Sequence, residues 1–353
     1  MKLLFFVDDF KGGAGNVIQI LAQNFSKKKY EVAICCLGGT TPGRHSLDGV
    51  KVYRIAKCSK KINTYISFVS ESRKIIKKET PDCVVSFLFG VSAFVNLAIR
   101  GLGIPIIVSE RSDPNYLKPS GLVKFLTEYA YKKCNAIVVL FDAFRSLGGG
   151  KYVKKAITIP NPVPVIELAP KIVDTCEFRF VTIANNTPPK GLDILVDAFV
   201  EARKKIDTIV LHIYGSDNNG DLKKRIENSN AGSYIKQMGY TLNVNEALGW
   251  SDVYVMPSRH EGFPNSLCEA MSAGKCCIAT ECHPGIKEII QNGVNGITVA
   301  AEDVQKLTNA IINLTNSPEL ISQLGEEARK LSQKYNTESI LEEWNDLICH
   351  VVN

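Results

Sequence analysis

The sequence predicts an α/β protein with two doubly wound, Rossmann-like domains that face each other across a cleft. Three observations lead to this fold class: the chain has 353 residues, short apolar runs alternate with longer helix-like stretches in both halves, and a proline-rich segment separates the halves. A chain of this length exceeds the size at which a single hydrophobic core keeps growing. Two domains of roughly 150 to 180 residues are therefore expected.

The first half alternates β-branched and aromatic runs with helical stretches, which is the pattern of βαβ units. The nearly continuous apolar character of the runs fits parallel strands that helices cover on both faces. We expect a helix at 17–28 and strands at 2–10, 31–37, 82–89, 104–110, 136–141 and 156–160.

A domain boundary is expected near residue 163. Asn161-Pro162-Val163-Pro164 and then Ala169-Pro170 interrupt the pattern, and prolines suit a linker because they lock the backbone and donate no hydrogen bond. Residues 1–162 then form the first domain and 163–336 the second. The second half repeats the βαβ pattern, with strands expected at 178–184, 208–214, 253–256 and 275–280.

The C-terminal segment 337–353 is predicted to be an amphipathic helix behind a capping Asn336 or Thr337. The spacing leaves two arrangements open, since the helix either finishes the second domain or crosses back to complete the first. Its apolar residues at helical spacing are Ile340, Leu341, Trp344, Leu347, Ile348 and Val351.

The composition is that of an ordered globular protein, with 45% hydrophobic and 22% charged residues. The opening apolar run ends at Asp8 and Asp9, too soon for a signal peptide. No apolar run reaches the length of about 18 residues that a spanning helix needs, so any membrane contact is expected to be peripheral. The eleven cysteines lie mostly in apolar runs, which favours reduced core cysteines in a cytoplasmic protein.

Charge is divided unevenly along the chain. Residues 1–162 hold 25 Lys and Arg against 11 Asp and Glu, whereas residues 163–353 hold 17 against 25. A basic half suggests an anionic partner, such as a membrane surface, a phosphorylated acceptor or nucleic acid. A solvated lysine-rich surface explains the charge excess equally well. Nucleic acid is not expected, because no recognised binding module accompanies the charge.

Small residues follow the first predicted strand, in Lys11-Gly12-Gly13-Ala14-Gly15-Asn16. Glycines between a strand and a helix suit phosphate, because the first N–H groups of the helix are open there. The run departs from the dinucleotide fingerprint G-x-G-x-x-G, and a plain tight turn is the alternative explanation.

The strongest local pattern runs from Ser258 to Gly274, directly after the strand at 253–256. Pro264 fits the first position of a helix. Glu261 then lies in the loop and Glu269 well inside the helix, so the two carboxylates have different surroundings. The open N–H groups near Asn265, Ser266 and Leu267 are expected to form an anion site that suits a diphosphate.

This run, together with Pro284–Ile290 and Asn292–Gly296, resembles the signature of retaining glycosyltransferase family 4, whose hallmark is two glutamates separated by seven residues. The resemblance covers nearly the whole chain and implies the GT-B architecture of the group 1 glycosyl transferases. It implies transfer of a sugar from a nucleotide-sugar, with a UDP-sugar expected, to a lipid-linked or polysaccharide acceptor in bacterial surface glycan assembly. The acceptor is expected mainly on the first domain and the donor mainly on the second.

The resemblance also implies roles for single residues. Lys190, before Gly191, matches a lysine that contacts the donor phosphate, and Glu261 is expected to approach the sugar hydroxyls; these two are the catalytic candidates. Glu269 is expected to accept hydrogen bonds from the ribose, as suits an ionised carboxylate. The further donor-binding candidates are Gly13, Ala14, Gly15, Asn265, Ser266 and Leu267.

Two positions depart from the family pattern. Many members carry Gly-Arg where this chain has Ala184-Asn185-Asn186, so another group must balance the diphosphate charge, and Arg259, Arg111 or the helix start are the candidates. A histidine common in the first domain is also missing. The corresponding region contains the acceptor-side candidates Glu110, Arg111 and Asp113, with an ordinary polar loop as the alternative.

No metal or other cofactor is expected, because the histidines show no ligand spacing and no Asp-x-Asp pair is present. Two other classes stay open: a nucleotide-sugar epimerase of similar fold, and an inactive partner protein that binds a sugar-nucleotide or a lipid. Helix-like segments at 60–79 and 116–134 mingle apolar and basic residues, which fits either core packing or an anionic membrane at the inner face of the plasma membrane.

Overall fold

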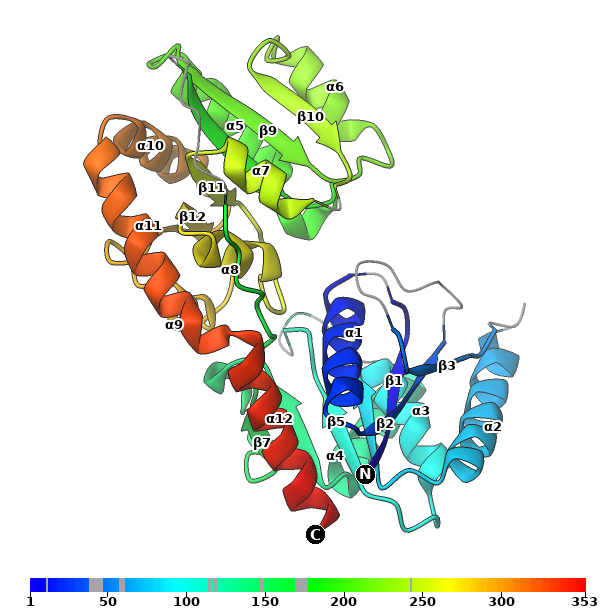
Figure 1. Ribbon diagram of the computed structural model, residues 1–353. Coiled ribbons are helices and arrows are strands. Elements are labelled where there is room, and N and C mark those ends of the chain that lie inside the picture. The colour runs from blue at the N-terminus through cyan, green and yellow to red at the C-terminus, as the bar shows by residue number, and fades with distance from the viewer. Residues whose placement is uncertain are drawn as a thin grey trace. The chain divides into compact units, whose positions relative to one another are not determined.

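The computed structural model describes residues 1–10, 12–37, 47–56, 61–113, 116, 120–146, 149–168, 177–241 and 243–353. It divides the chain into two compact units (Figure 1). The first unit comprises Met1–Pro162 and Glu338–Asn353, and the second comprises Val163–Thr337. Lys11 and Ala169-Pro170, which entered the predictions above, lie outside the described residues.

The first unit contains a seven-stranded sheet in the order β3-β2-β1-β4-β5-β6-β7, and every pairing in it is parallel. The strand order reverses between β1 and β4, and in doubly wound folds ligands bind at the carboxyl ends of the strands beside such a reversal. Its strands are β1 (Lys2–Val7), β2 (Glu31–Cys36), β3 (Lys51–Arg54), β4 (Cys83–Phe87), β5 (Ile106–Ser109), β6 (Ala136–Val139) and β7 (Ala156–Thr158).

The C-terminal helix completes the core of the first unit, which decides between the two arrangements that the sequence left open. Trp344 is fully buried and stacks on Phe87 of β4 with ring centroids 6.1 Å apart. Arg111 lies over the same tryptophan ring at 5.4 Å. The α-helices of this unit are α1 (Gly12–Lys27), α2 (Lys61–Glu79), α3 (Phe89–Ile99), α4 (Gly121–Lys133) and α12 (Thr337–Val352).

The second unit contains a six-stranded parallel sheet in the order β10-β9-β8-β11-β12-β13. Its strand order reverses between β8 and β11, so these two neighbours define the switch point of this sheet. Its strands are β8 (Phe178–Ile183), β9 (Ile209–Tyr214), β10 (Ile235–Gly239), β11 (Val253–Met256), β12 (Cys276–Thr280) and β13 (Ile297–Val299).

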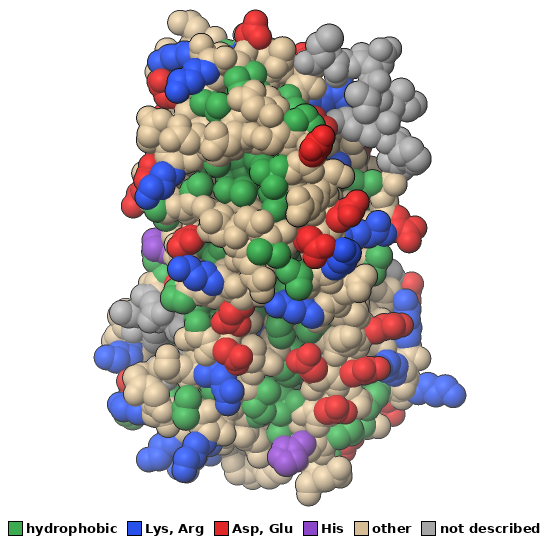
Figure 2. Space-filling view, turned by 90° about the vertical axis from the view of Figure 1, so that its left-hand side faces the viewer, with side chains coloured by type: hydrophobic (Ala, Val, Ile, Leu, Met, Phe, Trp, Pro, Cys, Tyr) green, Lys and Arg blue, Asp and Glu red, His purple; other side chains and the backbone are tan. Residues whose placement is uncertain are grey.

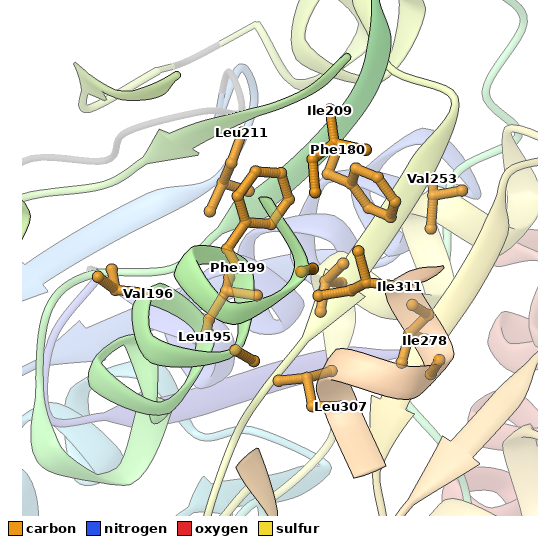
Figure 3. Close-up of a cluster of buried hydrophobic side chains, with 14 of the residues drawn as sticks. Phe180, Leu195, Val196, Phe199, Ile209, Leu211, Val253, Ile278, Leu307 and Ile311 are labelled. Carbon is orange, nitrogen blue, oxygen red and sulfur yellow. The ribbon is translucent and has the colours of Figure 1, made fainter. Parts of the chain in front are cut away.

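Helices cover the sheet of the second unit and enclose its core. Phe180 and Leu211 from the strands pack with Phe199 from α5 and Ile311 from α10 in one buried cluster (Figure 3). The α-helices of this unit are α5 (Leu192–Arg203), α6 (Asp221–Asn228), α7 (Val244–Trp250), α8 (Asn265–Ser272), α9 (Ile286–Ile289), α10 (Val304–Thr315) and α11 (Pro318–Ser332). The predicted α/β class with two doubly wound, Rossmann-like domains is thereby confirmed.

The structure differs from the sequence prediction at the sheet edges and at one helix start. Three strands were not predicted, namely β3, β10 and β13, and each is the outermost strand of its sheet. Helix α1 begins at Gly12, five residues before the predicted start. The small residues Gly13, Ala14 and Gly15 therefore form the first turns of the helix instead of a separate loop.

Within the described residues no helix is long and apolar enough to cross a membrane. The first unit holds 25 Lys and Arg against 15 Asp and Glu, because α12 adds four acidic residues, and the second unit holds 17 against 21. Acidic and basic side chains nevertheless lie intermixed over the face drawn in Figure 2. The charge difference between the units is therefore not visible as a one-signed patch on that face.

A buried carboxylate ties α2 to the amino ends of two strands, and it makes the first unit sensitive to acid. Glu79 accepts hydrogen bonds from Lys2, at 2.8 Å, and from the Tyr53 hydroxyl, and Lys51 lies 3.5 Å away. Burial alone would raise the pKa of Glu79, but the hydrogen bonds from Lys2 and Tyr53 outweigh it and lower the pKa to about 2.

Because the folded pKa lies below the ordinary value of about 4.5, ionised Glu79 stabilises the fold above that value, and this contribution is lost as the pH falls toward 2. We expect Glu79→Gln to lower the free energy of unfolding at neutral pH, with a difference from wild type that shrinks as the pH falls from about 4.5 to 2. Urea denaturation across that range measures the difference. Glu71→Gln, an exposed ion-pair partner on the same helix, is the control. A difference that does not change with pH would contradict the assignment.

Candidate functional site

The switch point of the second unit brings two chain segments together, since β8 and β11 are parallel neighbours. The segment after β8 forms a short 3₁₀ turn, Pro188–Lys190, before α5 begins. The segment after β11 is the loop from Pro257 to Pro264, which leads into α8. Lys190 and Glu261, the two catalytic candidates, lie on these two segments.

Backbone contacts hold the turn against the loop. The N–H groups of Arg259 and His260 both donate to the carbonyl of Pro189, at 2.7 and 3.1 Å. Gly191 has a φ of +63°, and a Cβ atom there would lie 2.1 Å from the Pro257 carbonyl oxygen. A glycine is therefore required directly after Lys190, both for its backbone conformation and for the close approach of the loop.

The side chains of Lys190 and Glu261 meet directly. The Lys190 ammonium lies 2.6 and 2.8 Å from the two carboxylate oxygens of Glu261. The Ser258 hydroxyl donates to the same carboxylate at 2.7 Å. The Glu261 side chain is 9% exposed and that of Lys190 is 32% exposed, so the cation faces solvent while the carboxylate lies beneath it. An anion that approaches from solvent would meet the lysine first.

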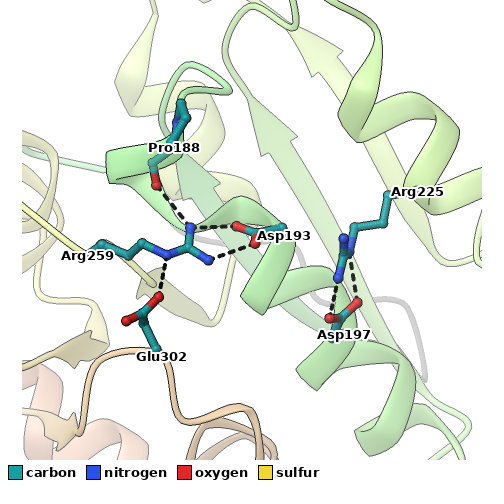
Figure 4. Close-up of polar contacts among 6 residues, drawn as sticks. All are labelled: Pro188, Asp193, Asp197, Arg225, Arg259 and Glu302. Atoms are coloured by element: carbon teal, nitrogen blue, oxygen red, sulfur yellow. Dashed lines mark hydrogen bonds and ion pairs between the residues drawn. The ribbon is translucent and has the colours of Figure 1, made fainter.

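Arg259 joins three parts of the second unit (Figure 4). Its guanidinium binds both carboxylate oxygens of Asp193, in the first turn of α5, at 2.8 and 2.7 Å. It also donates to the Pro188 carbonyl and to Glu302, each at 2.9 Å. The hydrogen bond from Arg259 lowers the pKa of Asp193. Four of the five guanidinium N–H groups are thus engaged within the protein, which leaves little capacity for balancing a diphosphate.

Helix α8 begins at Asn265, so Pro264 stands one position earlier than predicted. Of the three backbone N–H groups expected to bind an anion, that of Asn265 donates to the Phe263 carbonyl at 2.9 Å. The Ser266 hydroxyl pairs with the buried Tyr254 hydroxyl at 2.7 Å. Leu267 has a fully buried side chain, so any contact that it makes with an anion would be through its backbone N–H group. The backbone N–H groups of Ser266 and Leu267 remain the anion candidates.

Glu269 is partly buried and lies within α8, about one helical turn after its first residue, Asn265. The two carboxylates therefore occupy different structural settings, as their spacing indicated. Sequence reasoning missed Ser258, Tyr254 and Asp193 as supports of the site. Asp193 carries a local signal, because an acidic residue in the first helical turn directly after Lys190-Gly191 is well placed to pair with a cation from the adjacent loop.

The glycine-rich residues lie in the first unit, at the carboxyl end of β1. Gly13 is exposed and Ala14 is partly buried. A Cβ atom on Gly15 would lie 2.3 Å from the Phe10 carbonyl carbon and oxygen, so close packing of the helix on the preceding turn explains this glycine. A phosphate-binding role for Gly13, Ala14 and Gly15 stays a prediction.

The acceptor-side candidates are also in the first unit, at the carboxyl end of β5, and all three are buried. Glu110 accepts hydrogen bonds from Tyr131 and from the backbone N–H group of Phe89, where α3 begins. Burial raises the pKa of Glu110 to about 7 in spite of these bonds. Arg111 donates to Ser109, to the Ile159 carbonyl and to Asn161. Glu110 and Arg111 thus support α3 and α12 from within, and Asp113 is 7% exposed.

Two family descriptions match the chain in tandem: Glycosyltransferase Family 4 over residues 11–165 and Glycosyl transferases group 1 over residues 177–317. An uncharacterized glycosyltransferase of Haemophilus influenzae is 26% identical and aligns over 98% of this chain and 99% of its own length. The Campylobacter jejuni GalNAc-alpha-(1->4)-GalNAc-alpha-(1->3)-diNAcBac-PP-undecaprenol alpha-1,4-N-acetyl-D-galactosaminyltransferase is 24% identical over 100% and 99% of the two chains. The crystal structure of Anabaena Alr3699/HepE in complex with UDP-glucose superposes with a TM-score of 0.85 at 16% identity, over 99% and 100%.

Proposed function

The chain belongs to the glycosyltransferases of family 4 and group 1, and from this premise we propose that it transfers a sugar, with retention at the anomeric carbon, from a nucleotide-diphosphate-sugar to a lipid-linked or polysaccharide acceptor. The observation that carries the proposal is the contact between Lys190 and Glu261 at the switch point of the second unit. A UDP-sugar is the donor class that we propose, and surface glycan assembly is the process.

The reaction needs little beyond charge stabilisation and orientation. As the bond between the anomeric carbon and the diphosphate oxygen breaks, negative charge grows on the diphosphate. Lys190 and the N–H groups of Ser266 and Leu267 stabilise that charge. Glu261 orients the sugar hydroxyls. The acceptor hydroxyl oxygen bonds to the same face of the anomeric carbon, and its proton passes to the departing phosphate oxygen, so no histidine base is required.

The Campylobacter relative supports a lipid-linked acceptor, because its name places the acceptor sugars on undecaprenol diphosphate. We propose that the acceptor binds mainly to the first unit, whose net charge is positive. We further propose that Glu269 binds the donor ribose and that the reaction uses no metal ion. Among the described residues no group of three or more His, Cys, Asp or Glu side chains is placed to hold a metal.

Thermal shift with a panel of nucleotide-sugars tests the donor assignment, since a ligand that binds only the native state raises the melting temperature. We expect UDP-sugars to raise it without added metal, and Lys190→Ala to reduce the shift. Labelled sugar from the best donor is then offered to lipid extracts, and a labelled product is expected. Isomerisation of the donor without an acceptor would instead indicate an epimerase, and binding without any transfer would indicate an inactive partner protein.

We also propose that the first unit contacts the cytoplasmic face of an anionic membrane through α4. Leu122 and Phe125 lie one helical turn apart near the start of this helix and are 57% and 68% exposed, and Lys124 between them is also exposed. Exposed apolar side chains beside lysines favour the surface of an anionic bilayer.

Co-sedimentation with vesicles tests the membrane contact. We expect wild-type protein to bind vesicles that contain phosphatidylglycerol and to bind pure phosphatidylcholine vesicles weakly. Phe125→Ser should weaken binding by about 10- to 100-fold, since burying one such side chain is worth about 1.5–3 kcal/mol. Val165→Ser, at an equally exposed apolar position of the second unit, is the control. Equal binding by both variants would contradict the assignment to α4.

A further inference from the structure

We infer that Arg259 is a positioning residue, which sets the distance between Lys190 and Glu261 by fastening the turn that carries the lysine to the loop that carries the glutamate. Lys190 and Glu261 follow different strands, so their separation depends on how these two segments are held together. Arg259 belongs to the second segment, and its side chain binds the first at the Pro188 carbonyl and at Asp193.

The contacts of Arg259 surround Lys190 in the sequence. Pro188 lies two residues before the lysine and Asp193 three residues after it, in the first turn of α5. One planar guanidinium therefore binds the chain on both sides of Lys190. The Arg259 backbone N–H group adds a fourth bond, to the carbonyl of Pro189. Pro188 and Pro189, which precede Lys190, are therefore both hydrogen-bonded to Arg259. Gly191, which follows Lys190, packs against the loop at Pro257. The lysine itself is left to contact Glu261.

Arginine is the residue type that this geometry requires. The planar fork of the guanidinium matches the two oxygens of a carboxylate, whereas the ammonium of a lysine is a compact point charge that lacks this fixed geometry. The Nε–H group of Arg259 donates to the Glu302 carboxylate, which lies after β13, at 2.9 Å. The guanidinium is thus fixed from two sides, and hydrogen bonding to Asp193 raises the pKa of Arg259 above its ordinary value.

A second arginine pair on the same helix provides a matched control. Arg225 of α6 binds the two carboxylate oxygens of Asp197, one helical turn after Asp193 on α5 (Figure 4). This pair has the same bidentate form and is more exposed, with Arg225 42% and Arg259 23% exposed. Its hydrogen bonds join α5 to α6 and, among the described residues, include none to the turn or the loop. Loss of an arginine–aspartate pair as such can therefore be separated from loss of the positioning contact.

The first arm of the experiment measures amide hydrogen exchange in Arg259→Met, Arg259→Lys and Arg225→Met. Exchange in peptides that span 186–192 and 257–263 is expected to be at least about fivefold faster in Arg259→Met, because the bonds to the Pro189 carbonyl open more often. Arg259→Lys should lie between Arg259→Met and wild type. Arg225→Met should leave both peptides unchanged. Equal protection in Arg259→Met and wild type would overturn the inference.

The second arm measures turnover and rests on the proposed function. We expect kcat in Arg259→Met to fall by about 10- to 100-fold with little change in the acceptor KM, because a small misplacement of catalytic groups has effects of this size. Asp193→Asn combined with Arg259→Met should be no worse than Arg259→Met alone, since the two residues act as one unit. Arg225→Met should retain wild-type kcat.

The two arms fail separately. If wild-type protein transfers sugar from no donor, the proposed function fails, whereas the exchange arm still decides whether Arg259 holds the turn. If Arg259→Met exchanges faster but keeps wild-type kcat, the contact exists and the positioning role is refuted. If Arg259→Met and Arg225→Met lower kcat equally, the effect belongs to general stability, and the inference is likewise refuted.

Discussion

Lys190→Ala is expected to lower kcat by about 10²–10³-fold, the usual cost of removing one group that stabilises developing charge in a transition state. The protein should stay folded, because Lys190 is about one third exposed and the turn around it is held by backbone contacts and by Arg259. Steady-state rates with the donor found by thermal shift, together with circular dichroism, measure both outcomes.

The partner residue sharpens this test. Removing Lys190 leaves the Glu261 carboxylate, which is 9% exposed, without its cation, although the Ser258 hydroxyl still donates to it. Part of the fall in kcat could come from this change at Glu261. Glu261→Gln is expected to lower kcat by a similar factor while keeping the shape of the side chain. Lys205→Ala, at an exposed lysine just beyond the end of α5, serves as the control. Rates within about threefold of wild type for Lys190→Ala would contradict the proposed role of the lysine.

Trp344→Ala is expected to have the largest effect on stability. Its side chain is fully buried against Phe87 and Arg111, and truncation of a buried tryptophan typically costs about 3–5 kcal/mol. The loss should fall on the first unit, because α12 packs there. Arg111 would also lose an aromatic face on which its buried guanidinium rests.

The chain has two tryptophans, which lets the units be followed separately. Trp250 lies in the second unit, so its fluorescence reports that unit in Trp344→Ala. We expect the circular dichroism transition in urea to begin at lower concentration, while the Trp250 transition stays near that of wild type. Glu342→Ala, at an exposed position of the same helix, should change neither. A common shift of both transitions would show that the effect is not confined to the first unit.

The sheet interiors could be predicted from the sequence, whereas three of the four edge strands, β3, β10 and β13, could not. Central strands such as β1 and β11 are buried on both faces and consist of nearly continuous apolar residues. The edge strand β10, Ile-Lys-Gln-Met-Gly, has one buried residue and four exposed ones. Hydrophobic patterning reports burial, so it says little about a strand that mostly faces water. The same reason explains why β3 was missed.

The candidate site shows the same division. Glu261 and Lys190 were identifiable because the signature run and the lysine before Gly191 stand in a recognisable local context. The pairing of Arg259 with Asp193 and Glu302 joins positions 66 and 43 residues apart, and no local pattern reports such contacts. For the same reason the partners of Arg111, Asn161 and Trp344, could not be predicted, since they lie far along the chain. The acceptor-side role of Arg111 stays a prediction.

The return of α12 has a consequence for biosynthesis. Topologically, the second unit is an insertion in the first, because the chain leaves the first unit at Pro162 and rejoins it at Glu338. A ribosome that has made the first 162 residues has not yet made Trp344, which fills their core, so the first unit cannot complete its core until α12 has been translated. The inserted unit, by contrast, is encoded in one continuous stretch. The second unit can begin to fold while the chain is still attached to the ribosome. We expect a gene fragment that encodes Val163–Thr337 to express this unit alone.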